Sequence, residues 1–176
     1  EIAPSQNNLP VQATDPFQKA QMLYERGDYR EAAEMVTELL RLDKTDTRAL
    51  ALLCRIYANE GKLTEALQVS DQALAANKLS AGLHYLRAVI LMEQGMDDES
   101  ATSLKKSLYL DQDMVLAYFT LANLEKRTGK NNESRKHFDT ALSLLARYRQ
   151  DDVIPESEGM LAGRLGEIIR ATTAHL

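Results

Sequence analysis

The sequence predicts an all-α protein in which four copies of one helical hairpin stack side by side into a solenoid. The first observation is a strict period, since four glycines lie 34 residues apart and a glutamate follows each of them by four residues: Gly27, Gly61, Gly95 and Gly129, then Glu31, Glu65, Glu99 and Glu133. A period of this length is typical of stacked helix–turn–helix units. The second observation is that no stretch alternates apolar and polar residues over strand length, so no strand is expected.

The four units align without gaps, at about residues 13–46, 47–80, 81–114 and 115–148. Two positions within the unit are always small, and a third is always leucine: Ala20, Cys54, Ala88 and Ala122; Ala32, Ala66, Ser100 and Ser134; Leu40, Leu74, Leu108 and Leu142. Helices that cross closely need small side chains at the crossing, and leucine supplies bulk for the core between units. Each glycine suits the left-handed residue that ends a helix, because glycine adopts a positive φ at low steric cost.

Apolar residues recur at helical spacing on both sides of each glycine. In the second unit, Leu50, Leu53 and Tyr57 precede Gly61 at intervals of three and four residues. The same periodicity predicts helices near residues 16–26, 29–42, 47–60, 63–76, 81–94, 97–109, 115–128 and 131–147. An ordinary helical bundle is the alternative fold, but a bundle would not need the same residue every 34 positions.

The turns between paired helices share a short motif. Gly-Asp-Tyr-Arg-Glu-Ala at 27–32 and Gly-Lys-Leu-Thr-Glu-Ala at 61–66 resemble the inter-helix turn of the tetratricopeptide repeat (TPR) family, and the resemblance spans about residues 13–146. The family's usual Trp near the unit start and Pro after the second helix are absent, although the packing positions are kept. The resemblance implies a right-handed α-solenoid that binds a protein or peptide partner and catalyses no reaction.

The composition restricts the function further. The chain is 44% hydrophobic and 27% charged, which is ordinary for a soluble globular protein. Its formal net charge of −5 argues against broad nucleic-acid binding, which needs a basic surface. No apolar run approaches the roughly 18 residues that span a bilayer, so we expect no membrane insertion. A single cysteine is consistent with a reducing compartment, and we expect a cytoplasmic location.

The N-terminal residues differ from the repeats. Residues 1–14 are polar and contain Pro4 and Pro10, so we expect a flexible linker that joins the repeats to something N-terminal. The chain begins with Glu1 rather than Met, which suggests an excised piece of a longer protein.

Beyond the four repeat units (15–147), we expect a polar connection over 149–157 and a ninth helix over 158–174. One face of this helix is apolar and comprises Met160, Leu161, Leu165, Ile168, Ile169 and Thr172. The last unit of a solenoid exposes an apolar face that must be covered, so we interpret the ninth helix as a cap. The alternatives are that it folds back into the groove as an occupant or docks on a partner domain.

The C-terminal residues also carry a more specific pattern, Glu158-Gly159-Met160-Leu161-Ala162-Gly163-Arg164-Leu165 followed by Glu167-Ile168-Ile169-Arg170. It resembles the closing segment of CheR-class chemotaxis methyltransferases, which carry TPRs after their catalytic domain; residues 83–88, 107–111 and 117–124 match as well. The resemblance implies that the whole protein transfers a methyl group from S-adenosylmethionine to receptor glutamates. The catalytic domain would lie upstream of Glu1, and the partner would be a chemoreceptor or a signalling regulator.

A stand-alone TPR adaptor in a bacterial assembly, with no enzyme attached, is the alternative function. No S-adenosylmethionine-binding residue is assigned to this chain, because it has no glycine-rich nucleotide loop after a strand. Cys54 occupies a small-residue packing position, so we expect a buried, inert thiol. His84, His137 and His175 fall in different elements without metal-ligand spacing. We therefore expect no catalytic, cofactor-binding or metal-binding residue in this chain.

The concave face is the candidate binding surface, because the first helix of each unit lines it in the TPR family. The candidate groove residues are Phe17, Tyr24, Arg48, Arg55, Asn59, Tyr85, Met92, Phe119, Asn123 and Lys126. Aromatic, methionine, cationic and amide side chains together favour an extended or helical peptide with acidic character. Arg55 and Lys126 are the cations expected to contact it.

Two observations limit this groove prediction. The family's two-carboxylate clamp for peptide C-termini is not reproduced, because Ala51 and Arg55 stand where that pattern has Lys and Asn. Binding of chaperone tails is therefore not expected. The aromatic residues also have an alternative interpretation, since side chains at this spacing can pack against the neighbouring unit instead of contacting a ligand.

Overall fold

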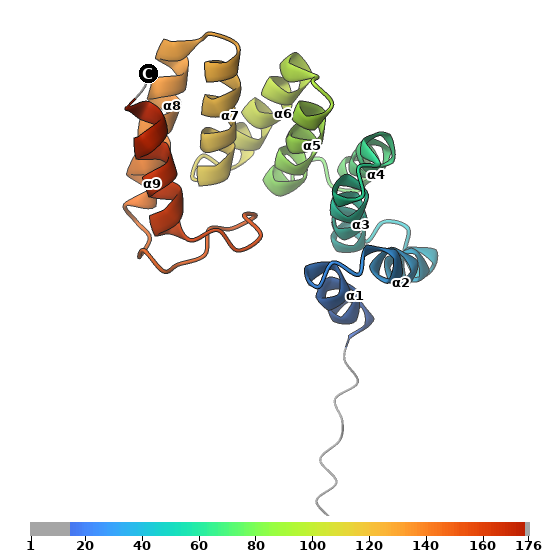
Figure 1. Ribbon diagram of the computed structural model, residues 1–176. Coiled ribbons are helices and arrows are strands. Elements are labelled where there is room, and N and C mark those ends of the chain that lie inside the picture. The colour runs from blue at the N-terminus through green and yellow to red at the C-terminus, as the bar shows by residue number, and fades with distance from the viewer. Residues whose placement is uncertain (1–14, 175–176) are drawn as a thin grey trace, which may run out of the picture.

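The computed structural model describes residues 15–174 as a curved stack of helices (Figure 1). In this range the helices are α1 (Pro16–Glu25), α2 (Tyr29–Leu42), α3 (Thr47–Asn59), α4 (Leu63–Ala76), α5 (Ala81–Glu93), α6 (Asp97–Leu110), α7 (Val115–Arg127), α8 (Asn131–Leu145) and α9 (Ala162–Thr173). The first eight form four hairpins, which confirms the predicted all-α solenoid with a C-terminal helix. The predicted linker, residues 1–14, and His175 lie outside the described residues.

Caps and glycine turns set the helix boundaries. Asp15, Asp46 and Ser80 each accept a hydrogen bond from a backbone N–H in the first turn of α1, α3 and α5. The four turn glycines have φ between 73° and 85°, and a Cβ built on any of them would meet no atom within 4 Å. The left-handed backbone, and not crowding, is therefore what requires glycine at these turns.

The small-residue positions lie at the closest helix contacts. All eight are 0% exposed. The Cys54 Sγ–H lies 3.3 Å from the carbonyl oxygen of Ala66, and Ser100 Oγ donates to the carbonyl of Ala88 at 2.8 Å. A side chain can reach the backbone of the paired helix in this way only because both facing positions are small. The leucines of the third repeated position are half-buried and pack beside these contacts.

The ninth helix covers the end of the solenoid. Leu165 and Ile169 of α9 are buried in one cluster with Phe138 and Leu144 of α8. The cap interpretation of this helix is therefore confirmed, and the helix is not the groove occupant. Its start is different from the prediction, because the helix begins at Ala162 and not at residue 158.

The residues between α8 and α9 form a hairpin-like segment, which we call the hairpin loop (residues 149–161). Backbone hydrogen bonds join Ile154 N–H to the Met160 carbonyl (2.9 Å) and Ala162 N–H to the Asp152 carbonyl (2.9 Å). An isolated antiparallel bridge pairs Val153 with Leu161, although no strand forms in the described range. Glu156, Glu158 and Gly159 have φ of 64°, 54° and 102°, which prevents a helix from starting at residue 158.

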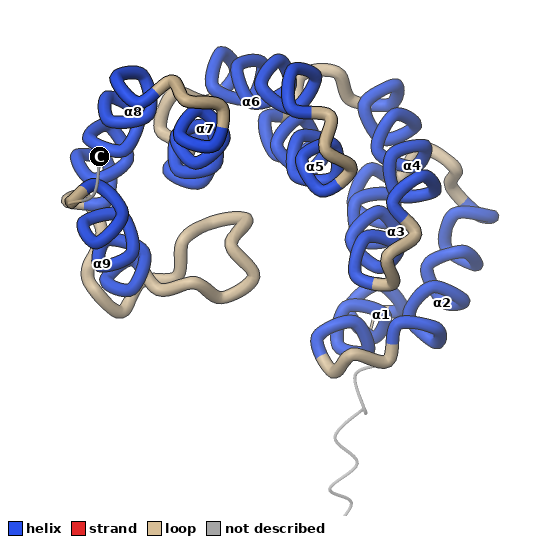
Figure 2. The backbone as a smooth tube through the Cα atoms, turned by 45° about the horizontal axis from the view of Figure 1, so that its top comes forward, coloured by secondary structure: helices blue, strands red, loops and turns tan. Residues whose placement is uncertain are grey.

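The hairpin loop points into the concave side of the solenoid. Figure 2 shows it leaving the α8–α9 end and extending into the space that the curve of helices encloses, toward α3 and α5. Gly163 allows its two ends to close together, since a Cβ there would lie 3.1 Å from the carbonyl oxygen of Gln150. The polar connection expected over 149–157 is thus an ordered, self-bonded element that reaches the candidate groove.

Candidate binding groove

The concave face contains two adjoining clefts. The larger has a volume of about 910 Å³ and is lined by α1, α3, α5 and the hairpin loop. The smaller, of about 320 Å³, is lined by α3, α5, α7 and the same loop. Both share Arg55, Asn59, Leu86, Glu156 and Glu158. The tip of the hairpin loop therefore separates one half of the groove from the other.

Arg55 is the centre of the contacts between groove and loop. Its Nη2 donates to Glu156 Oε2, and its Nε lies 3.7 Å from Glu158 Oε1. The Arg55 side chain is 27% exposed, so these ion pairs are only partly screened by water. One guanidinium thus faces two carboxylates from a segment that is 101 residues away along the chain.

Tyr24 and Asn59 complete the polar cluster. The Tyr24 hydroxyl donates to Glu158 Oε1 at 2.6 Å, and Asn59 Nδ2 donates to the Tyr24 oxygen at 2.9 Å. Burial and the hydrogen bond to Glu158 raise the pKa of Tyr24 well above its usual range, so the hydroxyl remains a neutral donor. Together, Arg55, Tyr24 and Asn59 form a carboxylate-binding cluster made of side chains from two neighbouring units.

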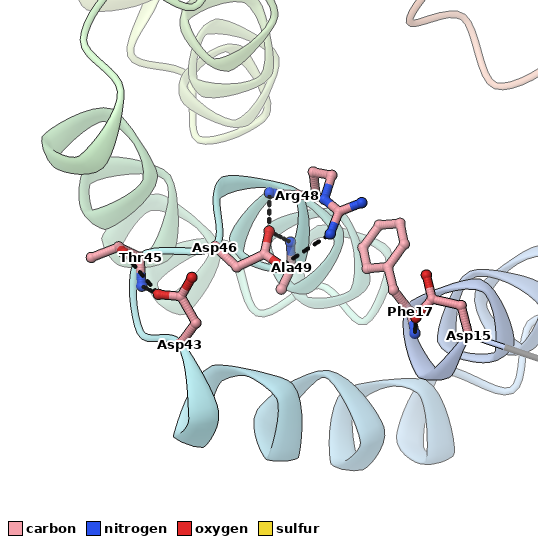
Figure 3. Close-up of polar contacts among 7 residues, drawn as sticks. All are labelled: Asp15, Phe17, Asp43, Thr45, Asp46, Arg48 and Ala49. Carbon is pink, nitrogen blue, oxygen red and sulfur yellow. Dashed lines mark hydrogen bonds and ion pairs between the residues drawn. The ribbon is translucent and has the colours of Figure 1, made fainter.

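A second cation lies at the N-terminal end of the larger cleft. The Arg48 guanidinium carbon is 5.1 Å from the ring centroid of Phe17, which is a cation–π distance. Asp46 accepts from the backbone N–H groups of Arg48 (2.9 Å) and Ala49 (3.2 Å), and its second oxygen lies 3.4 Å from Arg48 Nη2 (Figure 3). The Arg48 side chain is nevertheless 68% exposed, so it is accessible to a ligand.

Seven of the ten predicted groove residues line the two clefts: Phe17, Tyr24, Arg48, Arg55, Asn59, Tyr85 and Phe119. Tyr85 is largely buried, and this burial raises the pKa of its hydroxyl. Phe119 packs against Phe138 with ring centroids 6.1 Å apart, so it has a core role as well. The structure brings residues of all four units together around the hairpin loop.

The other three predicted residues, Met92, Asn123 and Lys126, line neither cleft. Met92 packs against the central core cluster, and Asn123 Nδ2 donates to the carbonyl of Phe119 at 2.9 Å within its own helix. Tyr24 lines a cleft, whereas the equivalent positions two and three units later, Met92 and Lys126, do not. Position within the repeat alone therefore does not predict which residues line a cleft.

The hairpin loop contributes residues to the groove that the sequence did not predict. Glu156, Ser157, Glu158, Gly159 and Met160 all line a cleft. The only local signal was a Glu-Ser-Glu-Gly stretch after Pro155 in an otherwise polar connection. Gly82 of α5 adds a second clue that only the fold reveals, since a Cβ there would lie 3.1 Å from Glu156 Oε1.

The remaining reactive side chains have structural surroundings. Burial raises the pKa of the Cys54 thiol to about 12, which disfavours the nucleophilic thiolate. His137 Nδ1 lies 2.6 Å from Glu125 Oε2 between α7 and α8. The part of the chain that the structure describes contains no cluster of three or more metal-ligating side chains. In the same part, no helix is both long and apolar enough to cross a membrane.

Comparison with known proteins agrees with this fold. The curated relatives include the human Protein O-mannosyl-transferase TMTC1, 24% identical over 148 residues, which covers 82% of this chain and 16% of that protein. They also include the Tetratricopeptide repeat protein 21 homolog of Caenorhabditis elegans, 26% identical over 130 residues, which covers 70% of this chain and 9% of that protein. The chain therefore spans less than a fifth of each relative's length.

Solved structures of MamA resemble the chain in fold. MamA 41-end from Desulfovibrio magneticus RS-1 has a TM-score of 0.68 at 20% identity and covers 78% of both chains. Another MamA crystal structure has a TM-score of 0.66 at 16% identity and covers 91% of this chain and 85% of that one. None of the proteins named here is described as a chemotaxis methyltransferase.

Two family models match the chain directly. Both are described as tetratricopeptide repeat, and they match residues 23–90 and 81–114, which together make up just over half of the sequence. The matches run from the C-terminal end of α1 through the third hairpin, and the fourth hairpin has the same turn glycine and small-residue positions. The chain therefore belongs to the tetratricopeptide repeat family, and it is a protein-interaction domain of that family.

Proposed function

We propose that the concave groove binds an extended, acidic segment of a partner protein. The observation that carries this proposal is the cluster of Arg55, Tyr24 and Asn59, which already holds two carboxylates supplied by a distant segment of the same chain. A site that holds carboxylates from an irregular backbone within one molecule has the donors needed to hold them from another.

Arg48 and Phe17 supply a second anchor for the same ligand. Their cation–π pair lies in the larger cleft, beside apolar wall residues such as Leu52 and Leu83. A cation stacked on an aromatic ring attracts carboxylates and offers apolar area as well, which is typical of residues that dominate protein interfaces. A ligand that reaches from Arg48 to Arg55 would follow α3 for seven residues, about two helical turns.

The experiment is calorimetric titration of a partner identified by affinity selection, against wild-type and charge-reversed chains. Arg48→Glu should weaken binding at least about tenfold, because it reverses the charge of an exposed groove cation. Lys126→Glu is the matched control, since Lys126 also lies on a first helix but lines neither cleft. Equal losses of affinity for both variants would contradict the groove assignment.

A second proposal concerns a longer protein of which this domain would be a part. We propose a chemotaxis methyltransferase in which the domain places an upstream, S-adenosylmethionine-dependent catalytic domain near its chemoreceptor or a signalling regulator, in the cytoplasm. The resemblance of residues 158–170 to CheR-class enzymes supports it. Placing an enzyme near its target raises the local concentration without any new catalytic group.

Sequencing the gene upstream of Glu1 tests this second proposal. A strand-rich domain that binds S-adenosylmethionine would support the methyltransferase. A lipoprotein signal or a further run of repeats would instead support a stand-alone TPR adaptor. Neither result affects the groove proposal, because the groove is contained in the described residues.

A further inference from the structure

The hairpin loop occupies the part of the groove that a partner would need. Its glutamates lie on Arg55 and Tyr24, and its tip separates the two clefts that would otherwise join along α3 and α5. The contacts join segments 101 and 134 residues apart in sequence. Occupancy of the site by the chain itself is therefore a property of the tertiary fold.

The backbone of the loop tip is strained at the two glutamates that make these contacts. Glu156 and Glu158 both have left-handed backbone, with φ of 64° and 54°, where a non-glycine residue is strained. The neighbouring Gly159 also has a left-handed backbone, and the residue there is glycine. Glutamates at strained positions, with side chains directed at a guanidinium and a tyrosine hydroxyl, point to a role for their carboxylates.

The rest of the loop is built to present this tip. The backbone hydrogen bonds at Ile154 and Ala162 hold the two arms of the hairpin together without using any glutamate side chain. The C-terminal arm continues directly into α9, whose Leu165 and Ile169 are anchored in the core. On the groove side, Gly82 leaves the space that the Glu156 carboxylate fills.

We propose that the loop tip, residues 155–159, is a built-in competitor for the groove, and that the partner is a segment with two carboxylates two residues apart that replace Glu156 and Glu158. This inference rests on the proposed function and adds the regulation and the chemistry of the ligand. A tethered segment acts at an effective concentration of roughly millimolar, so it excludes weak acidic ligands and yields to a better-fitting one. The partner's apparent affinity equals its intrinsic affinity multiplied by the fraction of time that the groove is open.

The test uses the full chain and a synthetic peptide of residues 152–161 with blocked termini, followed by NMR titration of the Arg55 and Tyr24 signals. The key variant is Glu156→Gly with Glu158→Gly, because glycine keeps the left-handed backbone while it removes the side chains that carry the two carboxylates. If the loop closes the groove about nine-tenths of the time, the double variant should bind the peptide about tenfold more tightly than the wild type. Adding Arg55→Gln to the double variant should abolish this binding.

A second variant tests whether the peptide takes the place of the loop tip. Gly82→Ala places a methyl group 3.1 Å from the position of Glu156 Oε1, so in the double glycine background it should lower peptide affinity by a factor of about two to five, because the peptide carboxylate meets the same methyl group. A peptide with glutamine at both glutamate positions is the matched ligand control and should not bind. Amide exchange at Ile154 and Ala162 verifies that the hairpin itself stays folded in each variant.

The outcomes separate this inference from the proposed function. Equal peptide affinity for wild type and the double glycine variant would overturn the competitor role, and so would no binding to either. In both cases the proposed function stands if Arg48→Glu still weakens the natural partner and Lys126→Glu does not. It fails if both substitutions weaken the partner equally, or if neither has an effect.

Discussion

The turns of the repeats and the tip of the hairpin loop share a left-handed backbone, but they place different residue types in it. In the repeats, every left-handed turn residue is glycine, at Gly27, Gly61, Gly95 and Gly129. In the hairpin loop, two of the three left-handed residues are glutamates, Glu156 and Glu158. Each turn glycine lies in open space, whereas each loop glutamate contacts a groove side chain.

The difference shows what each region is for. A turn that only needs to reverse the chain uses glycine, which adopts positive φ at little cost. A turn that must also present a carboxylate accepts about 1 kcal/mol or more of backbone strain, because the side chain is needed. The repeat turns therefore serve the scaffold, and the loop tip serves the groove.

The largest expected effect tests whether stability comes from the stack of repeats. Phe138 is fully buried between α8 and its neighbours, so Phe138→Ala should reduce the free energy of unfolding by about 3–5 kcal/mol in urea titrations followed by helical circular dichroism. Tyr109→Ala is the control, since this aromatic is 77% exposed and its loss should cost no more than about 0.5 kcal/mol. Similar losses for both would mean that the core assignment is wrong.

The next effect isolates the left-handed turn itself. Gly61→Ala adds a methyl group in open space at a φ of 73°, so any loss is backbone strain, about 1–2 kcal/mol of unfolding free energy. The same substitution at Gly166, inside α9, should be neutral or stabilise the fold by up to about 1 kcal/mol, because alanine favours helix and the atom nearest its Cβ, Arg170 Nη2 at 3.3 Å, is the end of a flexible side chain that can move. Loss of stability at Gly166 and not at Gly61 would reverse the interpretation of the turns.

A third pair of substitutions tests whether equivalent positions in two repeats contribute equally to the free energy of unfolding. Ser100 Oγ donates to a buried carbonyl, so Ser100→Ala should destabilise by about 1 kcal/mol. Ser134 occupies the same position one unit later, but its Oγ is buried without a hydrogen-bond partner, so Ser134→Ala should be neutral or stabilising by about 1 kcal/mol. Both are measured by urea unfolding; equal destabilisation would indicate that Ser134 also bonds across its hairpin.

The smallest effect addresses the strain at the loop tip. In the wild type, Glu156→Gly relieves strain but removes the pair with Arg55, so the net change in unfolding free energy should stay within about 0.5 kcal/mol. In an Arg55→Gln background the pair is already lost, and the same substitution should stabilise by about 1 kcal/mol. A double-mutant cycle without coupling between the two residues would show that Arg55 does not hold the loop tip.

Most of the predicted groove residues line the two clefts, and all of them lie on the helical side. Phe17, Arg48 and Tyr85 were found because a fixed position in the repeat puts a side chain on a fixed face of the solenoid. Lys126 was predicted by the same rule and is outside the clefts, although Phe119 of the same helix lines one, because the rule does not state which turns of a helix the hairpin loop faces. The residues that line the clefts depend on where the hairpin loop meets the helices.

The repeats were determined by the sequence alone, because each hairpin contacts only its neighbours and its packing positions recur at a fixed interval that can be counted. The tertiary structure alone decided that residues 155–159 reach Arg55 and Tyr24. That contact depends on the curvature that accumulates over four hairpins. The curvature brings the hairpin loop back to the concave face of the earlier units. A local sequence pattern does not predict the accumulated curvature.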